Sequence, residues 1–330
     1  MLEIPLRDFL LHSLSLSFPH PVSGERLAQE AGVSRVAVWK EAQALRAKGF
    51  PIQASRAGYR LLSLPDRLEG AFLQALLRDT FPGLRVVFFP ELSSTNSYVK
   101  ELASRGEKEG TVILTENQTQ GRGRRGRTWF SQPGKALTFS FLLRPSLSLR
   151  LSPLVGLLVA LVLAQALEEL GFSPYLKWPN DLWIGERKVA GILLESSAEM
   201  EEVEWIVVGV GVNVNMTSHD FPEELRSRVT SLAMEKGETI PRWQILRTFF
   251  SRFAREYPRF LKEKSFAPWR EAFEERSLLA GRRVRVHWEG GEKRGMAVGI
   301  DEEGALWIQG EDGEKERIQW GEVSLDPLVN

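Results

Sequence analysis

The chain has 330 residues, a length that favours two or three domains, and its content of 43% hydrophobic and 26% charged residues is typical of a globular protein. Lysine plus arginine and aspartate plus glutamate both total 43, so any attraction to nucleic acid or to a membrane must come from local charge. Because the chain has no cysteine, disulfides, thiolate metal sites and a cysteine nucleophile are excluded.

Residues 1–64 predict a first domain of three helices followed by a short hairpin. Ser23 and Ser34 are the expected N-caps of the second and third helices, because a serine hydroxyl can accept from the free N–H groups of the first turn. Gly32 stands where the chain must turn between these two helices, and residues 56–58 are the expected hairpin turn.

Residues 65–277 mix helical and strand patterns and predict a second domain. We expect strands at 85–89, 111–115, 137–143, 182–184, 189–195 and 205–214, and helices at 96–104, 153–170 and 243–262. Several strands follow one another directly, which favours an α+β sheet with its helices packed on one side over a doubly wound fold.

Residues 278–330 predict a third, all-β domain. Val284 and Val286 alternate with polar neighbours, and glycine-containing turns are expected at 289–291 and 301–304. Short strands with such turns favour a small SH3-like β-barrel. The predicted fold class is therefore multidomain α+β.

The chain is expected to be cytoplasmic and to make no contact with a membrane. Glu3 and Asp8 lie where a secretory signal peptide needs positive charge. The most apolar run, residues 154–167, is shorter than the roughly 20 residues that span a bilayer, so we interpret it as a buried helix.

The first domain is predicted to bind DNA. Ala28, Gly32 and Val38 supply the small residue, the turn and the apolar plug of a helix-turn-helix. Residues 34–60 hold six lysines and arginines against the single acid Glu41, so positive charge gathers where phosphates would lie. The expected DNA-binding residues are Ser34, Arg35, Trp39, Lys40 and Arg56. The alternatives are a solvated basic face and, for Trp39, a position inside the domain.

Gly121–Arg127 combines four arginines with three glycines and predicts an anion-binding loop. Glycines let backbone N–H groups approach an anion, and guanidinium groups bind phosphate or carboxylate with two parallel hydrogen bonds. An RNA-binding Arg-Gly segment or a solvated turn are the alternatives, but this segment is single and lies between apolar strands. We expect it to be mobile until an anion neutralises it.

Three other segments carry polar chemistry. Residues 177–181 (Lys-Trp-Pro-Asn-Asp) place a cation, a turn and a carboxylate together, and Lys188 follows before a strand. The glycines of residues 209–213 are expected to leave room for a ligand against the sheet, although a third glycine and a following helix of the dinucleotide fingerprint are missing. Residues 93–96 (Ser-Ser-Thr-Asn) precede a helix, and simple N-capping is the alternative there.

Taken together these segments resemble the biotin–protein ligases, and with the first domain the bifunctional ligase–repressors of biotin operons. The resemblance covers essentially the whole chain, and residues 320–325 resemble the end of the family's C-terminal domain. The matching elements, in the family's order, are Ser94–Asn96, Gln118, Gly121–Arg127, Trp129, Lys177–Asp181, Lys188 and Gly209–Asn213.

The resemblance implies a central domain of the biotin/lipoate ligase type and a two-step reaction. Biotin and ATP form biotinyl-5′-AMP, and a lysine of the biotin carboxyl carrier protein then takes the biotin. It also implies repression at operator DNA of biotin genes, and a homodimer when biotinyl-AMP is bound.

The same resemblance assigns roles to residues. Lys188, Arg124 and Asp181 would be catalytic, with Asp181 either binding Mg²⁺ or orienting the acceptor lysine. The residues implied to bind biotin, ATP or biotinyl-AMP are Ser94, Thr95, Asn96, Gln118, Gly121, Arg122, Gly123, Arg124, Arg127, Trp129, Lys177, Asn180, Lys188, Gly191, Gly209, Gly211 and Asn213. The aromatic residue that stacks on adenine in some members has no clear counterpart, and Phe221 is the candidate.

Three other functions stay open at this point. The first is a ligase whose DNA-binding domain no longer regulates, against which the basic helix and hairpin argue. The second is a lipoate–protein ligase, which shares the catalytic fold. The Gly-Arg loop and the helix-turn-helix both argue against it. The third is a transcription factor that senses a ligand without catalysis, which the presence of Lys188 and Asp181 disfavours.

Overall fold

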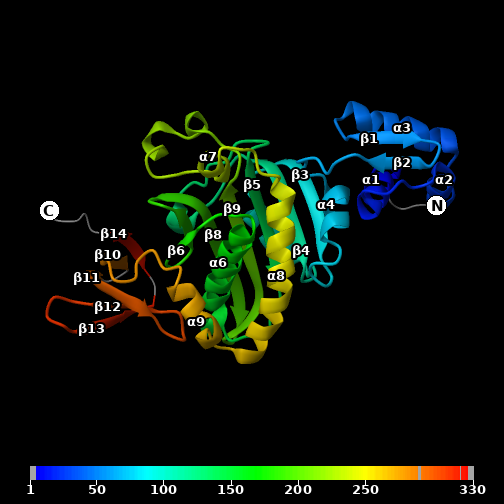
Figure 1. The fold of residues 1–330 in the computed structure, drawn as a ribbon. Coiled ribbons are helices and arrows are strands. Elements are labelled where there is room, and N and C mark those ends of the chain that lie inside the picture. The colour runs from blue at the N-terminus through cyan, green and yellow to red at the C-terminus, as the bar shows by residue number, and fades with distance from the viewer. Residues whose placement is uncertain (1–4, 289–290, 320, 326–330) are drawn as a thin grey trace.

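The structure is a computed structural model that describes residues 5–288, 291–319 and 321–325 (Figure 1). Its strands form three separate sheets, of two, seven and five strands, which follow one another along the chain. The largest sheet lies in the middle of the molecule, between the N-terminal helices and the C-terminal strands (Figure 1).

The N-terminal part has the predicted three helices and hairpin. Ser23 accepts from the N–H groups of Glu25 and Arg26, and Ser34 accepts from the N–H of Ala37, which confirms both N-caps. Gly32 adopts φ = 65°, in the left-handed region that favours glycine. The elements are α1 (Leu6–Ser17), α2 (Gly24–Ala31), α3 (Arg35–Ala47), β1 (Ile52–Ser55) and β2 (Gly58–Leu61), with β1 and β2 antiparallel.

A short helix that the sequence pattern does not predict, α4 (Gly70–Leu77), joins this part to the central sheet. Helix α1 packs against it. The rings of Phe50 and Phe72 meet edge to face with centroids 6.0 Å apart. The guanidinium of Arg7 on α1 lies 2.6 Å from the carboxylate of Glu69, the residue before α4. The N-terminal helices and hairpin are thus seated against α4 and the segment before it through apolar side chains and one ion pair.

The central sheet contains all six predicted strands and one more. Its order is β3-β4-β5-β9-β8-β7-β6, with β3 and β4 parallel and the other pairs antiparallel. The additional strand is the three-residue β6 at one edge. The bounds are β3 (Arg85–Leu92), β4 (Thr111–Gln118), β5 (Ala136–Leu143), β6 (Tyr175–Lys177), β7 (Asp181–Ile184), β8 (Arg187–Glu199) and β9 (Glu202–Asn213).

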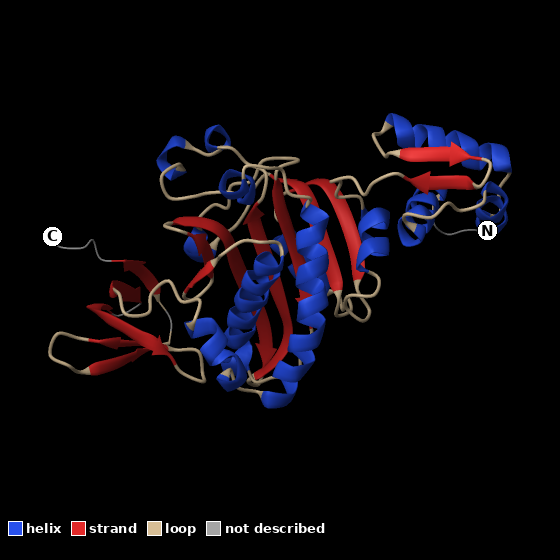
Figure 2. Cartoon of the chain, in the orientation of Figure 1, coloured by secondary structure: helices blue, strands red, loops and turns tan. Residues whose placement is uncertain are grey.

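Two long helices cover one face of this sheet, α6 (Ser152–Glu169) and α8 (Arg242–Glu263) (Figures 1 and 2). Phe139 of β5 points to this face, where its ring meets Phe249 and Phe250 of α8 at 5.8 Å. The four phenylalanines of α8 are therefore buried against the sheet.

A third helix, α5 (Thr95–Ser104), packs on the opposite face, so the expectation of helices on one side only is wrong. Ser140 of β5 points away from α8 and contacts Asn96 of α5, because successive side chains of a strand point to opposite faces. Val99 of α5 forms a second, smaller core with Leu142 and its neighbours. This second face carries the polar residues of the candidate site.

Helix α6 and the turn before it, residues 149–169, form a 21-residue stretch that is long and apolar enough to cross a membrane by composition alone. The most apolar run, residues 154–167, is itself shorter than a membrane span, but the helix continues past it at both ends. All of its apolar side chains from Leu154 to Leu167 are buried inside the protein, which confirms the interpretation as a buried helix. They belong to the core under the sheet.

The C-terminal strands form an open antiparallel sheet, so the predicted closed barrel is not found. The order β13-β12-β11-β10-β14 leaves β13 and β14 at opposite edges, and no pairing joins them within the described residues. Alternation and glycine turns predict hairpins, but closure depends on pairing between distant strands. The strands are β10 (Arg283–Trp288), β11 (Gly291–Ile300), β12 (Leu306–Gln309), β13 (Lys315–Ile318) and β14 (Glu322–Leu325).

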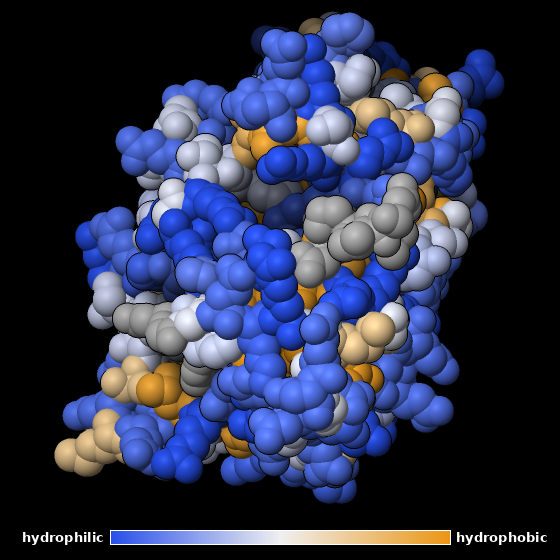
Figure 3. Space-filling model, turned by 90° about the vertical axis from the view of Figure 1, so that its left-hand side faces the viewer, coloured by the Kyte–Doolittle hydropathy of each residue, from blue (hydrophilic) through white to orange (hydrophobic). Residues whose placement is uncertain are grey.

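The remaining features complete the fold. The turn predicted at 301–304 connects β11 and β12, whereas Glu289 and Gly290 of the other predicted turn, like Trp320, lie outside the described residues. The face shown in Figure 3 is mainly hydrophilic, with apolar side chains in small patches. The short helices are α7 (Leu232–Lys236), α9 (Ala267–Glu274) and the 3-10 turns Arg124–Gly126, Leu149–Leu151, Ser218–Asp220 and Glu223–Leu225.

Candidate functional site

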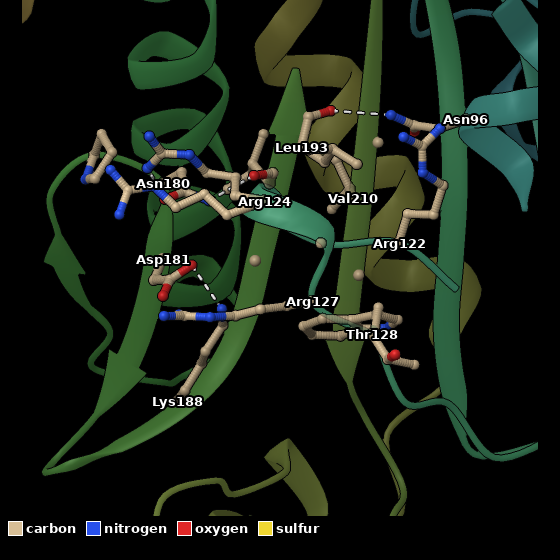
Figure 4. Close-up of a pocket in the computed structure, with 18 of the residues that line it drawn as sticks. Asn96, Arg122, Arg124, Arg127, Thr128, Asn180, Asp181, Lys188, Leu193 and Val210 are labelled. Atoms are coloured by element: carbon tan, nitrogen blue, oxygen red, sulfur yellow. Dashed lines mark hydrogen bonds and ion pairs between the residues drawn. The ribbon is translucent and has the colours of Figure 1, made fainter. Parts of the chain in front are cut away.

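One cavity on the α5 face of the central sheet gathers residues from seven regions of the chain (Figure 4). They come from the start of α5, the end of β4, the Gly-Arg loop, the turn after β6, strands β8 and β9, and the start of β14. The lining residues are Ser94–Asn96, Gln118, Arg122–Arg125, Arg127–Trp129, Lys177–Asp181, Lys188, Gly191–Leu193, Gly209–Gly211 and Gly321–Val323.

Glycines at the cavity floor allow two side chains to lie directly on the sheet. A Cβ at Gly209 would stand 2.0 Å from Oδ1 of Asn96, and one at Gly211 would stand 2.3 Å from the ring of Trp129. Any larger residue would therefore displace Asn96 or Trp129. The glycines leave the predicted room above the sheet. The side chains of Asn96 and Trp129 fill this room, and both line the cavity.

Cations converge on the cavity around a single aspartate. The ammonium of Lys188 lies 2.7 Å from Oδ1 of Asp181, a contact visible in Figure 4. Arg124 donates to Oδ1 of Asn180 at 3.0 Å. Burial lowers the pKa of Lys177, and the neighbouring Asp181 offsets part of that effect. Such a half-buried cluster of positive charge strongly favours an anionic ligand.

The arginines of the Gly-Arg loop are paired with carboxylates that the sequence motifs do not indicate. Arg122 lies 3.6 Å from Glu195 of β8, and Arg125 lies 3.7 Å from Glu322 of β14. Arg127 forms an ion pair with the same Glu322. The C-terminal sheet thus reaches the cavity and holds the loop. Gly321–Leu325 is distinctive in the sequence, but nothing there places it at the site.

A polar corner of the cavity is formed by the first turn of α5. Ser94 caps the helix by accepting from the N–H of Ser97 at 3.4 Å, so the capping alternative holds for this residue. The N–H of Thr95 donates to Oε1 of Gln118 at 2.9 Å. Thr95 and Asn96 are buried, yet both line the cavity.

Most of the expected ligand-binding residues line this cavity, but three do not. Gly121 lies behind it, where a Cβ would stand 2.3 Å from the carbonyl oxygen of Trp129. Asn213 is buried and donates to the carbonyl of Thr230 at 3.0 Å. Phe221 packs in a small core with Met216, so it is not a candidate for stacking on adenine. These three residues therefore lie outside the lining of the cavity.

The described part of the chain contains no group of three or more acidic or histidine side chains that could hold a metal ion. The two carboxylates that line the cavity are both paired with cations, Asp181 with Lys188 and Glu322 with Arg125 and Arg127. Any divalent cation there would depend on oxygen atoms of the ligand.

The expected DNA-binding residues lie together on the exposed side of α3 and on the hairpin tip. Trp39 is 50% exposed, so the alternative of an inward position is wrong. Lys40 on α3 and Arg56 in the hairpin are also exposed, whereas Val38 is buried behind them. Arg46 donates to the carbonyl of Ile52 and so fixes the hairpin against the helix. This arrangement is that of a winged helix.

The fold and the two sites define a class of protein: a DNA-binding type of domain followed by a ligase-like domain with an anion cavity. Family models match the same three parts. Residues 7–60 match an HTH domain, residues 88–213 match the biotin/lipoate A/B protein ligase family, and residues 280–326 match the biotin protein ligase C-terminal domain.

Similar proteins extend the match to nearly the whole chain. Bifunctional ligase/repressor BirA of Bacillus subtilis is 35% identical over 97% of this chain and 98% of its own length. The protein of the same name from Escherichia coli is 33% identical over 92% of each chain. A structure of the biotin protein ligase from Aquifex aeolicus, in complex with biotin and ATP, aligns with a TM-score of 0.62, 35% identity and coverage of 73% of this chain and 98% of that one. The chain belongs to the biotin protein ligase family, in its group of bifunctional ligase/repressors.

Proposed function

We propose that this chain is an ATP-dependent, AMP-forming ligase that attaches biotin to a lysine of the biotin carboxyl carrier protein. The observation that carries the proposal is the convergence of Lys188, Arg124 and Lys177 on one cavity that also has a polar corner and a tryptophan wall. This combination suits a ligand with a polar ring at one end, an apolar middle and an anionic group at the other.

In the first step a carboxylate oxygen of biotin attacks the α-phosphorus of ATP, and pyrophosphate leaves. Both reactants are anions, so fixed cations must offset their repulsion and the charge that develops on the phosphoryl oxygens. Lys188 is the cation that we assign to the biotin carboxylate and the α-phosphate. Arg122 and Arg124 cover the mixed anhydride and keep water away from it.

In the second step the neutral ε-amine of the carrier lysine attacks the carbonyl carbon of biotinyl-5′-AMP, loses a proton, and AMP leaves. Asp181 is placed to orient this amine, since its carboxylate faces the cavity beside Lys188. The ureido ring of biotin would bind at Ser94, Thr95 and Gln118, and its apolar part beside Trp129.

The residues present also fit Mg²⁺ as a companion of ATP. Mg²⁺ keeps several waters and is commonly held by one or two carboxylates together with substrate phosphates. Asp181 provides one such carboxylate within the cavity. The ion would supply positive charge for the phosphate oxygens, while the side chains of the chain bind and orient the organic parts.

The ligase activity is tested by incubating the chain with ATP, biotin and a carrier domain and measuring the mass of the carrier. We expect an increase equal to one biotin minus one water, and none without ATP. Lipoate in place of biotin distinguishes a lipoate–protein ligase. An unchanged carrier mass would instead favour a regulator without catalysis.

Arg124→Gly is expected to release biotinyl-AMP into solution. The substitution removes both a guanidinium from the cavity and its hydrogen bond to Asn180, so the anhydride is less well covered. Labelling of a bystander protein, added at high concentration, reports the released intermediate. Arg150→Gly, which removes an exposed arginine outside the cavity, is the control. If Arg124→Gly labels no more bystander than this control, Arg124 does not retain the intermediate.

We also propose that the N-terminal domain represses biotin-synthesis genes by binding their operator. The exposed basic side chains of α3 and the hairpin support this role, because phosphates attract such a surface. Ser34 and Arg35 are proposed to face base edges, since the first residues of a recognition helix contact the groove. A gel shift with the chain's own biotin-operon promoter, with and without biotin and ATP, distinguishes a regulatory domain from one that no longer regulates.

Lys40→Ala is expected to weaken operator and non-specific DNA binding to a similar extent. Losing one phosphate contact should reduce the slope of log affinity against log salt by about 0.9. Fluorescence anisotropy over a salt series measures both quantities. Arg26→Ala is the control, because Arg26 lies on α2 and pairs with Glu30 at 2.7 Å. An unchanged salt slope for Lys40→Ala would remove Lys40 from the DNA-binding surface.

Three further properties belong to this proposal. The domains are 1–64, 65–277 and 278–330, which the positions of the three sheets support. The chain pairs as a homodimer when biotinyl-AMP is bound, presenting two recognition helices to a two-fold operator. It works in the cytoplasm, where its DNA and its carrier protein are found. Sedimentation with and without biotin and ATP tests the dimer.

A further inference from the structure

A row of hydrogen-bonding side chains leads from Glu195 on β8 to the polar corner of the cavity. Oε1 of Glu195 accepts from the ammonium of Lys100 at 2.8 Å, and Oε2 accepts from Nδ2 of Asn96 at 3.0 Å. The carboxylate is mostly buried, with 19% of its side chain exposed. Its partners therefore include both a cation on α5 and a residue that lines the cavity.

The neighbours of Asn96 decide which way its amide faces. Nδ2 lies near two groups that only accept hydrogen bonds, the Glu195 carboxylate and the carbonyl of Leu193 at 3.4 Å (Figure 4). The amide nitrogen must face them, because the amide oxygen has no proton to donate. Oδ1 of Asn96 consequently points to the hydroxyl of Ser140, 2.6 Å away.

The direction of the hydrogen bond between Ser140 and Asn96 determines the direction of the hydrogen bond between Ser140 and Thr95. Oδ1 of Asn96 only accepts, so the single hydroxyl proton of Ser140 is directed to it. The hydroxyl oxygens of Ser140 and Thr95 lie 2.7 Å apart in a buried position, and this contact needs a proton too. Only Thr95 can supply it, so Thr95 donates to Ser140.

The hydroxyl oxygen of Thr95 then has only lone pairs to offer a ligand in the cavity, because its proton is directed to Ser140. Its hydroxyl oxygen is 3.1 Å from Oε1 of Gln118, a longer contact than the one to Ser140. That Gln118 oxygen already accepts from the N–H of Thr95 at 2.9 Å. A ligand N–H group is the natural partner for a hydroxyl oxygen in this state.

We propose that Glu195 is a positioning residue that sets the direction of the Asn96–Ser140–Thr95 chain and so makes Thr95 an acceptor for a ligand N–H, as in a cyclic urea. The inference rests on the proposed function, in which biotin brings such a group. Glu195 does not line the cavity and acts on it through its hydrogen bond from Asn96, whereas its contact with Arg122 at 3.6 Å is an ion pair beyond hydrogen-bond distance. Burial alone would raise the pKa of Glu195, but hydrogen bonds from Lys100 and Asn96 outweigh it and lower the pKa, which keeps the carboxylate an acceptor only.

Glu195→Gln should reverse the direction of the Asn96–Ser140–Thr95 hydrogen bonds, because Lys100 can only donate. The new glutamine must turn its oxygen to Lys100 and its NH₂ to Asn96, whose amide then rotates. Nδ2 of Asn96 would face Ser140, Ser140 would donate to Thr95, and the proton of Thr95 would be free to oppose a ligand N–H. We expect biotin to bind roughly 10-fold more weakly, with the KM for ATP unchanged.

Variants at Lys100 distinguish a reversed hydrogen-bond direction from an effect of the changed charge on biotin binding. In Lys100→Met the carboxylate still only accepts, so biotin binding should stay close to that of the parent chain. In the double variant Glu195→Gln/Lys100→Met, the hydrogen bond that held the glutamine oxygen is gone, and Arg122 at 3.6 Å is beyond hydrogen-bond distance. The glutamine can then turn its oxygen to Asn96, and most of the lost affinity should return. An effect of charge would look different, because biotin is an anion. Losing the negative charge of Glu195 would strengthen biotin binding and losing the positive charge of Lys100 would weaken it, whereas the double variant keeps the net charge of the parent pair.

Calorimetric titration of the full chain with biotin, together with KM values for biotin and ATP, tests the inference. Weak biotin binding by Glu195→Gln with recovery in the double variant supports it. Parent-like binding by Glu195→Gln, or a double variant as weak as the single one, overturns it. If Glu195→Gln fails to fold, Ser140→Ala interrupts the same chain without changing charge and should also weaken biotin binding; undiminished binding there overturns the inference equally. Failure of the parent chain to bind biotin would instead contradict the proposed function.

Discussion

Lys188→Ala is expected to slow formation of biotinyl-AMP by roughly 100- to 1000-fold, or about 2.7–4 kcal/mol, as for the loss of one preorganised group that stabilises transition-state charge. The ammonium of Lys188 is held by Asp181 at 2.7 Å and lies 5.7 Å from the centre of the Trp129 ring. It is thus fixed at the cavity wall before any anion arrives. Its removal also leaves the negative charge of Asp181 facing the incoming carboxylate and phosphate.

Pyrophosphate release in the absence of carrier protein measures this step alone. Arg187→Ala is a matched control, because it removes a cation from the adjacent position of β8 that pairs with Glu235 away from the cavity. We expect near-normal release from the control. Near-normal release from Lys188→Ala would remove Lys188 from the catalytic role, whatever its effect on transfer to the carrier.

Local patterns of the sequence were sufficient for the elements and for much of the candidate site. The N-caps Ser23 and Ser34 are recognisable because a cap acts within three residues of itself. The Gly-Arg loop and Lys177–Asp181 stand out for a similar reason: their unusual composition is contiguous. The structure adds that these separate segments surround a single cavity.

What the sequence could not show depends on contacts between distant residues. Glu195 and Glu322 look like ordinary strand acids, and only the register of β8 and the return of β14 bring them to Arg122, Arg125 and Arg127. The side of the sheet that α5 covers is equally hidden, because helix periodicity shows an apolar face without showing which surface receives it. The open C-terminal sheet is a third example, since hairpin patterns do not report whether the edge strands pair.

The strongest effect on stability is expected at a buried charge cluster around Arg242, at the start of α8. Its side chain is 2% exposed and contacts two carboxylates, Asp66 at 3.0 Å and Glu116 at 2.7 Å. It also donates to the carbonyl of Ala136 at 3.1 Å. Asp66 lies between the N-terminal domain and α4, and Glu116 lies two residues before Gln118, so Arg242 joins the interdomain segment to the strand behind the polar corner of the cavity.

Arg242→Ala is expected to reduce the free energy of unfolding by about 3–5 kcal/mol, because it leaves two carboxylates close together with no counter-charge. Urea titration followed by tryptophan fluorescence measures the change, and Arg247→Ala, an exposed arginine of the same helix, should alter it by no more than about 0.5 kcal/mol. The combination Arg242→Met with Asp66→Asn and Glu116→Gln removes all three charges while keeping acceptors for the N–H groups of Arg242 and Gly134. It should recover most of the loss if uncompensated charge is the cause. Recovery would show that the cluster specifies how the segments meet more than it adds net stability. A triple variant as unstable as Arg242→Ala would instead assign the loss to the hydrogen bonds of the guanidinium, such as the one to the carbonyl of Ala136, because methionine keeps the apolar stem.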